Sequence, residues 1–540
     1  MITRSRDRRC VFVASALLVL ALAAVSCDSG RTRGKPAPGG TVVIGLLSDP
    51  KTLNPLVAGS IESRNIIDLL FLKLLDEQSD FVSFEPELAD HWEFSADSLS
   101  ITFVLRKDVV WADGVPVTAD DVRFTWQLEM DTLVAWPTRS VKERIADVEV
   151  IDDHTVRFRF SNRYPYQLMD ANDGVILPKH VLESVPRDRF GASEFGRHPT
   201  GNGPFKLARW ESEQFIELER NPRYHERGLP HLDRVVFRIV PDMTTLVTQL
   251  KSGEIDCLES LPLDAISDIK ANHPEISIYT YMSRQYVFVA WNLRNPLFDS
   301  PDVRRALAMA VNTDEMIRTL WGGMARASDS PMHPILWAHD PSMTPIPFDP
   351  EKARAVLAGN GWFDSDGDGV LEKNGRRFEF EMISNQGNQL RADIMTMTQE
   401  YLRRVGVKVT PRTFEWNTFV QRITRGDFES CVLGWKTATR ADLTDLWRSS
   451  SSPPGGYNIP RYENAAVDSL IDLAKNSLDV PAARGLWYRC QRMIYDDQPI
   501  LFLAVPYEVV GLRSRYCNVK PDAIGFFVNL PEWYVGEKCP

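Results

Sequence analysis

The feature that most constrains the fold is an alternation of short strand-like runs with capped, amphipathic helical patterns along almost the whole chain. Such alternation is typical of α/β proteins, in which helices pack on a mixed sheet. Strands are expected at residues 41–47, 98–106, 154–160, 215–220, 234–240, 377–383, 407–410 and 500–505. Helices are expected at residues 62–75, from 118 onward, and at 242–253, 300–310, 349–359, 390–405, 465–475 and 481–495. The pattern therefore predicts an α/β fold.

Several helix boundaries carry explicit signals. Thr118 and Asp121 have the spacing of a capping box, and Ser300 and Asp349 each precede a proline at the first helical position. Asp242 opens a helix that Gly253 ends. No repeat of 20 to 50 residues is visible, which argues against a solenoid or a propeller.

The amino-terminal segment predicts export. Four arginines precede an apolar run at residues 11–24 that is too short for a comfortable membrane span. The run ends in Ala-Val-Ser-Cys at 24–27, which resembles a bacterial lipobox except that Ala24 stands where Leu is usual. We expect residues 1–26 to be a signal peptide, Cys27 to be lipidated, and the Gly- and Pro-rich residues 27–39 to form a tether. The alternative is ordinary secretory cleavage near Ala24 or Ser26. In both cases the protein works outside the cytoplasm, either anchored by lipid to the bacterial cell membrane or free in the periplasm.

Composition narrows the function classes. The chain has 62 basic and 73 acidic residues, a net charge of -11, which argues against a general nucleic-acid binder. Its 44% hydrophobic and 25% charged residues are ordinary for a globular protein and unlike a polytopic membrane protein. Five cysteines lie beyond Cys27 and none forms a CxxC pair; Cys517 and Cys539 are near enough to the carboxyl terminus to pair, although the sequence leaves the connectivity open.

Catalytic and cofactor signatures are missing. The sequence has no GxSxG elbow, no HExxH zinc motif and no GxxxxGK[ST] phosphate loop, and its nine histidines are scattered. These absences lower the expectation of an enzyme, although triads and carboxylate pairs can assemble from distant positions. We expect a protein that is not an enzyme and that uses no cofactor.

One acidic turn has the start of a calcium-binding loop. Asp364, Asp366 and Asp368 stand at positions 1, 3 and 5, and Gly369 at position 6. Position 12, where a bidentate Glu should complete the ligand shell, is Gly375. We therefore favour a tight Asp/Gly turn before the next strand over a metal site.

A series of short motifs, in order, resembles the bacterial extracellular solute-binding proteins of family 5. Each motif is weak, but their shared order over the mature chain is specific. They include Trp-Ala-Asp-Gly at 111–114, Thr-Ala-Asp-Asp-Val at 118–122, Gly-Asn-Gly-Pro-Phe at 201–205, Gly-Glu-Ile-Asp at 253–256, Asn-Leu-Arg at 292–294, Asp-Val-Arg-Arg-Ala-Leu at 302–307 and Asp-Gln-Pro at 497–499.

The resemblance implies a fold and a role. The fold would be the two-lobed periplasmic-binding-protein fold of type II, cluster C, with an extra domain. Residues 40–73, 198–285 and 505–540 would form a discontinuous domain I, residues 74–197 domain II, and residues 286–504 domain III. The protein would be the substrate-binding component of an ABC importer of the peptide, oligopeptide or nickel type. It would close on a peptide and deliver it to a membrane permease that works with cytoplasmic ATPases.

The resemblance also suggests ligand-binding residues. Peptide-binding relatives place an Asp soon after a Gly-Trp pair, but here Ala438 occupies that position after Gly434-Trp435, and Asp442 follows later. A dipeptide site is thereby disfavoured relative to a longer peptide or an oligosaccharide. Trp435 and Trp416 lie next to a predicted strand end or turn, where cleft residues tend to occur. The candidate ligand-binding residues are Trp435, Asp442, Asn385, Gln386, Trp416 and Asn292.

Three alternatives stay open at this point. Trp435 can equally belong to the core, with Asp442 capping the following helix. The protein can be a secreted hydrolase of peptides or glycans, which the missing motifs disfavour. It can also be a family member that senses or chaperones its ligand instead of feeding a transporter.

Overall fold

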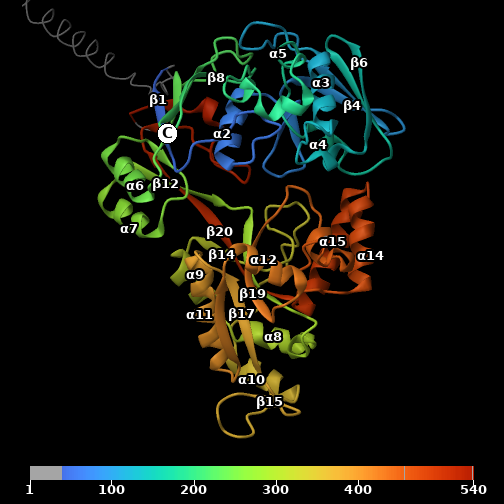
Figure 1. The fold of residues 1–540 in the computed structure, drawn as a ribbon, viewed down its shortest axis with the longest axis vertical. Helices are drawn as coiled ribbons and strands as arrows, with labels where there is room; N and C mark the ends of the chain where they lie inside the picture. The colour runs from blue at the N-terminus through green and yellow to red at the C-terminus, as the bar shows by residue number, and fades with distance from the viewer. Residues whose placement is uncertain (1–38, 455, 538, 540) are drawn as a thin grey trace, which may run out of the picture.

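The computed structural model describes residues 39–454, 456–537 and 539. It has two lobes, drawn as the upper and lower bodies of Figure 1. Two apolar cores belong almost wholly to the upper lobe and two to the lower lobe. The α/β prediction is confirmed. The expected signal peptide, Cys27 and nearly all of the expected tether lie outside the described residues.

A single mixed sheet runs through both lobes. Within the described residues it has twelve strands, ten of them in the order β18-β17-β19-β13-β20-β11-β1-β10-β9-β8, with β12 and β14 also paired to β20. The bounds are β1 (Thr41–Leu46), β8 (Phe205–Glu211), β9 (Phe215–Arg220), β10 (Arg234–Ile239), β11 (Cys257–Leu258), β12 (Ile276–Met282), β13 (Gln285–Trp291), β14 (Ala325–Ala327), β17 (Glu379–Asn385), β18 (Lys408–Phe414), β19 (Ser430–Lys436) and β20 (Ile500–Arg513).

Strand β20 connects the lobes. The apolar run predicts a strand that ends at residue 505, but β20 continues to Arg513 because β12 supplies a new antiparallel partner for its second half. Its first half pairs with β13 in the lower lobe. The chain crosses back between β12 and β13, where the Ser283 backbone N–H donates to the Pro506 carbonyl at 3.0 Å. The chain thus passes between the lobes twice, through β20 and through the connection from β12 to β13, and these two adjacent connections form a hinge.

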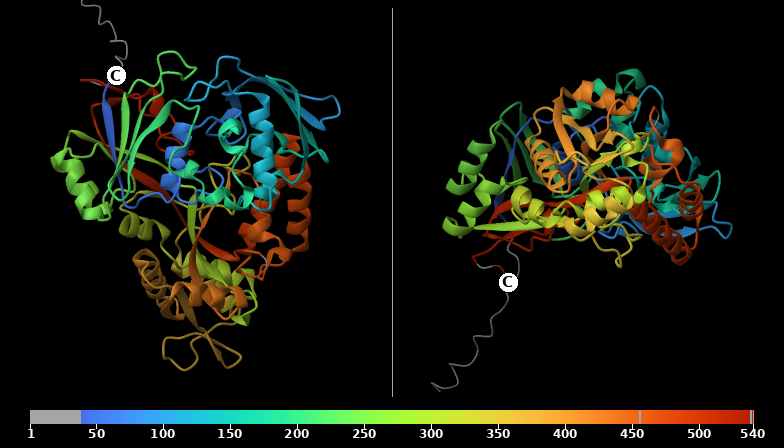
Figure 2. Two further views of the ribbon diagram at one scale, coloured as in Figure 1. Left: turned by 45° about the horizontal axis from the view of Figure 1, so that its top comes forward. Right: turned by 90° about the horizontal axis from the view of Figure 1, so that it is seen from below.

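The upper lobe divides into two ends. A four-stranded antiparallel sheet with α3 packed on it lies at one end, and α6 and α7 lie at the other, as both views of Figure 2 show. The capping box at Thr118 and Asp121 is present at the start of α3. The elements are β4 (Ala89–Phe94), β5 (Ser100–Leu105), β6 (Ile145–Asp152), β7 (Thr155–Phe160), α2 (Ile61–Leu70), α3 (Ala119–Met130), α4 (Gln167–Asn172), α5 (Lys179–Leu182), α6 (Met243–Ser252), α7 (Leu263–Asn272) and the hairpin β2 (Leu75–Glu77) with β3 (Phe84–Pro86).

Helix α2 is shorter than expected. The prediction extended it to residue 75, but it ends at Leu70. The Leu70 carbonyl accepts from Gly203 N–H at 2.8 Å, and the Leu72 N–H donates to the Asn202 side chain at 2.9 Å. These tertiary bonds replace the next helical turn, so apolar periodicity alone overestimated the length.

The lower lobe carries helices on its part of the sheet and a helical pair beside it (Figure 1). Its helices are α8 (Pro301–Met309), α9 (Thr313–Trp321), α10 (Pro350–Gly359), α11 (Gln389–Arg403), α12 (Trp416–Arg425), α13 (Thr444–Trp447), α14 (Ala465–Asn476) and α15 (Val480–Asp497). Two short strands, β15 (Glu372–Lys373) and β16 (Arg376–Arg377), form a hairpin at its tip. Asp349 caps α10 as expected, its side chain accepting from the Lys352 N–H at 2.9 Å.

The carboxyl-terminal segment folds back on the upper lobe. Strand β21 (Tyr516–Cys517) pairs with β22 (Tyr534–Val535), and a disulfide joins Cys517 to Cys539. The pairing that the sequence left open is thus formed. Among the described residues, Cys257, Cys431 and Cys490 are buried free thiols. No helix in the described part of the chain is both long enough and apolar enough to cross a membrane.

Candidate functional site

The lower lobe contains a cavity of about 200 Å³ at the ends of β13 and β19. Its wall is the segment that runs from the end of β19 into α13, completed by side chains from β13 and from residues 331–332. The lining residues are Tyr286, Pro331, Met332, Trp435, Lys436, Thr437, Ala438, Arg440, Asp442, Leu443, Asp445, Leu446 and Trp447. This volume suits one large side chain or part of a longer ligand, since whole drug-sized ligands occupy about 300–1,000 Å³.

Strand pairing places Trp435 in this wall. β19 runs antiparallel to β13, so that Trp435 lies opposite Tyr286 and Lys436 opposite Gln285. The Thr437 N–H then donates to the Arg284 carbonyl at 2.8 Å, after which the chain leaves the sheet. The Trp435 ring packs against Tyr457, with ring centroids 5.1 Å apart. Trp435 thus stands at a strand end, as expected, with its indole on the rim.

Asp442 lines the cavity and also orders the start of α13. One carboxylate oxygen, Oδ1, accepts from the Thr444 N–H at 2.8 Å and from the Thr444 hydroxyl at 2.5 Å. The residue is exposed, and Oδ2 makes no hydrogen bond within the described chain. The N-cap position of α13 is Leu443, so Asp442 lies one residue before it and orders the helix start through Thr444 instead of capping the helix.

Asn385 and Gln386 lie at the end of β17, which pairs with β19 on the side away from β13. Asn385 ends β17, and its side-chain oxygen accepts from Arg391 at 2.7 Å. The Arg391 guanidinium lies near Gly434, and burial lowers its pKa. Gln386 is exposed, with its backbone N–H bonded to the Phe414 carbonyl at 2.7 Å. Neither Asn385 nor Gln386 lines the cavity.

The remaining two candidates lie elsewhere. Trp416 is half-exposed at the first position of α12 and packs on Phe419. Asn292 is buried, and its amide nitrogen donates to the Gly426 and Phe428 carbonyls at 3.1 and 2.7 Å. It follows Tyr286 by six residues along β13, which at about 3.3 Å per residue places it roughly 20 Å from the cavity end of the strand. The side chain of Asn292 is thus used to bind the chain that leads into β19.

Three cations from separate elements influence one another electrostatically, and one of them, Lys436, lines the cavity. They are Arg64 of α2 in the upper lobe, Arg284 in the hinge and Lys436 of β19 in the lower lobe. Burial lowers the pKa of Lys436, and the charges of Arg284 and Arg64 lower it further. None of the three forms an ion pair with a described residue. Nearby acids offset part of the repulsion, because Glu508 acts on Lys436 and Glu77 on Arg284 in the direction that favours the charged form.

A carboxylate group lies on the upper-lobe side of the same region. Burial raises the pKa of Glu259 to about 7, and the charges of Glu508 and Glu62 contribute in the same direction. Asn65 of α2 donates to Glu259 at 3.1 Å. These acids come from α2, β20 and the chain after β11. Sequence reasoning missed both charge groups, because their members are far apart in the chain and no local motif marks them.

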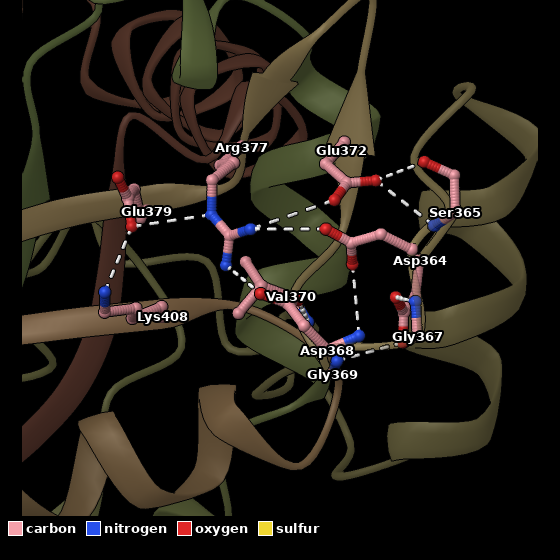
Figure 3. Close-up of polar contacts among 11 residues, drawn as sticks. Asp364, Ser365, Gly367, Asp368, Gly369, Val370, Glu372, Arg377, Glu379 and Lys408 are labelled. Carbon is pink, nitrogen blue, oxygen red and sulfur yellow. Dashed lines mark hydrogen bonds and ion pairs between the residues drawn. The ribbon is translucent and has the colours of Figure 1, made fainter.

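The Asp/Gly turn is present but is held by an arginine. Asp364 accepts from the Gly367 and Gly369 N–H groups at 2.8 and 3.0 Å, and Asp368 pairs with Arg377 at 2.5 Å (Figure 3). The Arg377 guanidinium also lies within 3.9 Å of carboxylates of Asp366, Glu372 and Glu379. The backbone turn is present, and one carboxylate oxygen from each of Asp364, Asp366 and Asp368 lies within 4.8 Å of the other two, a spacing that a metal ion could also bridge. Arg377 supplies the positive charge that balances the acidic groups.

Two lobes joined by paired crossing strands, with a cavity in the lower lobe beside their junction, are the arrangement of a solute-binding protein of the periplasmic type. The comparisons with known proteins agree. The family model for bacterial extracellular solute-binding proteins, family 5, matches residues 83–457. The chain therefore belongs to family 5 of these extracytoplasmic binding proteins.

Individual relatives are similar over their full lengths. The oligopeptide-binding protein AppA of Bacillus subtilis is 30% identical, with 98% of this chain and 100% of AppA covered. The heme-binding protein A of Haemophilus influenzae is 25% identical, with 95% and 96% covered. The solved structure of Bacillus subtilis AppA in complex with a nonapeptide has a TM-score of 0.72 and 29% identity, with 93% of this chain and 100% of that chain covered.

Proposed function

We propose that this protein is the substrate-binding component of an ABC importer, which captures an oligopeptide between its lobes and delivers it to a membrane permease. The observation that carries the proposal is the cavity at the ends of β13 and β19, which is lined by the charged residues Lys436, Arg440, Asp442 and Asp445 and which lies beside the upper lobe through the contact of Arg440 with Asp170. The similarity to the oligopeptide-binding protein AppA supports it.

The cationic group suits a carboxylate. Arg64, Arg284 and Lys436 are cations of the two lobes and of the hinge, and the charges of Arg284 and Arg64 act on Lys436. A ligand carboxylate would gain charge-assisted hydrogen bonds from them and relieve the repulsion among the three cations. The carboxylate would come from a peptide terminus or from an acidic side chain.

The acidic group suits an ammonium. Glu259, Glu508 and Glu62 repel one another in a half-buried site, and a ligand cation would offset that repulsion. A peptide is a zwitterion, and its two ends can satisfy both charge groups at once. A neutral oligosaccharide can satisfy neither.

The candidate residues keep distinct roles in this proposal. Trp435 provides a flat apolar wall for a ligand side chain, and the free Oδ2 of Asp442 accepts from a ligand N–H. Asn385 acts behind the wall by holding Arg391 near Gly434. Trp416, Gln386 and Asn292 are left without a ligand contact in this arrangement.

The proposed organisation follows the two lobes. Domain I (residues 40–73, 198–285 and 505–540) and domain II (residues 74–197) make the upper lobe, and domain III (residues 286–504) makes the lower one. Cys27 carries the lipid, and residues 27–39 tether the body near the permease.

Mass spectrometry of the material that copurifies with the mature protein tests the function. We expect peptides longer than two residues. A bound oligosaccharide would overturn the peptide proposal, and product formed from peptides or glycans by the purified protein would favour the hydrolase.

Calorimetry with the recovered ligand then tests the site. We expect Trp435→Ala and Asp442→Ala to weaken binding by about tenfold or more, in line with loss of an aromatic contact and a charge-assisted bond. Trp416→Ala is the matched control and should bind as the wild type does. Unchanged affinity in both cavity variants would rule out this site.

A further inference from the structure

Three side chains of the upper lobe contact the lower lobe, and all three belong to residues 78–170. Asp170 of α4 forms an ion pair with Arg440, which lines the cavity. Tyr166 donates its hydroxyl to the Ala441 carbonyl at 2.8 Å. Phe81, at the tip of the β2–β3 hairpin, is buried in a core cluster of the lower lobe together with Tyr286. Figure 1 shows α4 on the side of the upper lobe that faces the lower lobe.

Contacts around the ion pair between Asp170 and Arg440 hold both side chains in place. The Asp170 side chain is 2% exposed, and its Oδ2 accepts from the Tyr164 hydroxyl at 2.6 Å. The Arg440 side chain is 25% exposed and lies over the Tyr166 ring, 5.7 Å from its centroid. A buried carboxylate that lost Arg440 on lobe separation would keep only Tyr164, which makes separation costly.

The Phe81 contact is equally specific. Phe81 has φ of 55°, a left-handed conformation that is uncommon for a bulky residue. The turn is held by Asp80, whose Oδ1 accepts from the Val82 and Ser83 N–H groups at 2.9 and 2.8 Å. The side chain is only 2% exposed, although its own hairpin belongs to the other lobe.

These contacts converge on the cavity wall. Arg440 and Ala441 belong to the segment 436–447 that lines the cavity, and Phe81 packs in the cluster that contains Tyr286 and Met332, two more lining residues. We propose that Asp170 and Tyr166 are positioning residues for the binding site, which fix segment 437–442 against the upper lobe in the ligand-free protein. We call Phe81, Tyr166 and Asp170 of the proposed domain II the latch, because they hold the segment that lines the cavity and so set the shape of the cavity. The inference rests on the proposed function only in treating that cavity as the ligand site.

Amide hydrogen exchange on the ligand-free, full-length mature protein tests the latch without any ligand. We expect Asp170→Asn and Arg440→Gln each to accelerate exchange in segment 437–447 by about tenfold or more, because a charge-assisted bond of this kind contributes at least that factor. Arg440→Lys keeps the charge and should recover part of the protection. Tyr166→Phe, which loses only the bond to Ala441, should have a smaller effect.

The matched control is the ion pair between Asp340 and Arg492. It also joins a buried carboxylate, 1% exposed, to a more exposed arginine at 2.7 Å, but both residues belong to the lower lobe. Asp340→Asn and Arg492→Gln should leave exchange in segment 437–447 unchanged, and thermal melts identify any variant that fails to fold. Wild-type exchange in both Asp170→Asn and Arg440→Gln, or equal acceleration by the control pair, would overturn the proposal.

A second measurement separates this inference from the function. With the peptide recovered by copurification, Asp170→Asn, which changes no residue that lines the cavity, should release it faster than the wild type does. If no peptide binds, the proposed function fails and the exchange result still decides the latch. A release rate equal to that of the wild type would contradict the positioning role.

Discussion

Charged side chains at the junction of the lobes are held in surroundings that disfavour their charge. Glu259 shows this most clearly: burial and two neighbouring acids raise its pKa to about 7. A cationic ligand would stabilise the charged form of the Glu259 carboxylate, which its surroundings in the folded protein disfavour. The same reasoning applies, with the opposite sign, to Lys436. Residues of this kind are identified by the shift of their pKa and not by a sequence motif.

The raised pKa of Glu259 predicts a pH dependence of stability. The folded state holds the proton up to about pH 7 and the unfolded state only to about pH 4.5. The folded state therefore binds more protons between these values, and the free energy of unfolding falls as the pH rises through this window. With about 1.4 kcal/mol per pKa unit as a guide, we expect a loss of roughly 2–3 kcal/mol between pH 5 and pH 8.

Urea denaturation at pH 5 and at pH 8 checks this prediction. Glu259→Gln, which cannot ionise, should lose distinctly less stability between the two pH values than the wild type. An equal loss in both proteins would show that other groups cause the dependence.

At the scale of elements, contacts with neighbouring segments decide where a helix or strand ends when the local sequence pattern does not. Bonds from residues 202–203 end α2 at Leu70, and pairing with β12 carries β20 on to Arg513. The turn at 364–369 keeps its shape because Arg377 reaches it from β16.

The carboxyl-terminal element depends on its disulfide. The bond between Cys517 and Cys539 closes a separation of 22 residues over the aromatic cluster that includes Phe526 and Trp533. For a loop of that size the entropic model gives about 3 kcal/mol. We expect the Cys517→Ser, Cys539→Ser double variant to unfold at a lower temperature in a calorimetric melt.

A reducing agent provides the control for this element. It should lower the melting temperature of the wild type toward that of the double variant and should leave the double variant unchanged. A wild type that is insensitive to reduction would indicate that packing, not the disulfide, holds the segment.

The whole molecule is held together across the lobes by few contacts besides the hinge. Phe81 makes one of them, and its ring is buried in a core to which its own lobe otherwise contributes almost nothing. Truncating a buried Phe costs about 3–5 kcal/mol, and here that cost falls on lobe association more than on the folding of either lobe.

Phe81→Ala should therefore open the molecule. We expect a larger radius of gyration for the ligand-free variant in small-angle X-ray scattering, with a melting temperature close to that of the wild type. Val82→Ala changes an adjacent side chain that is 42% exposed and should leave both values unaltered. A Phe81→Ala protein with the wild-type radius would mean that the hinge and the ion pair suffice for closure.

The sequence by itself determined the α/β class, the capped helix starts, the tight Asp/Gly turn and the family, because these depend on local periodicity, capping chemistry and ordered motifs. It also singled out Trp435 and Asp442, which follow a strand end. The cation and acid groups, the Arg377 counter-charge and the contact between Asp170 and Arg440 were decided by the tertiary structure alone. Each joins residues that lie far apart in sequence or in separate elements, and such contacts depend on how the two lobes meet, which no local pattern encodes.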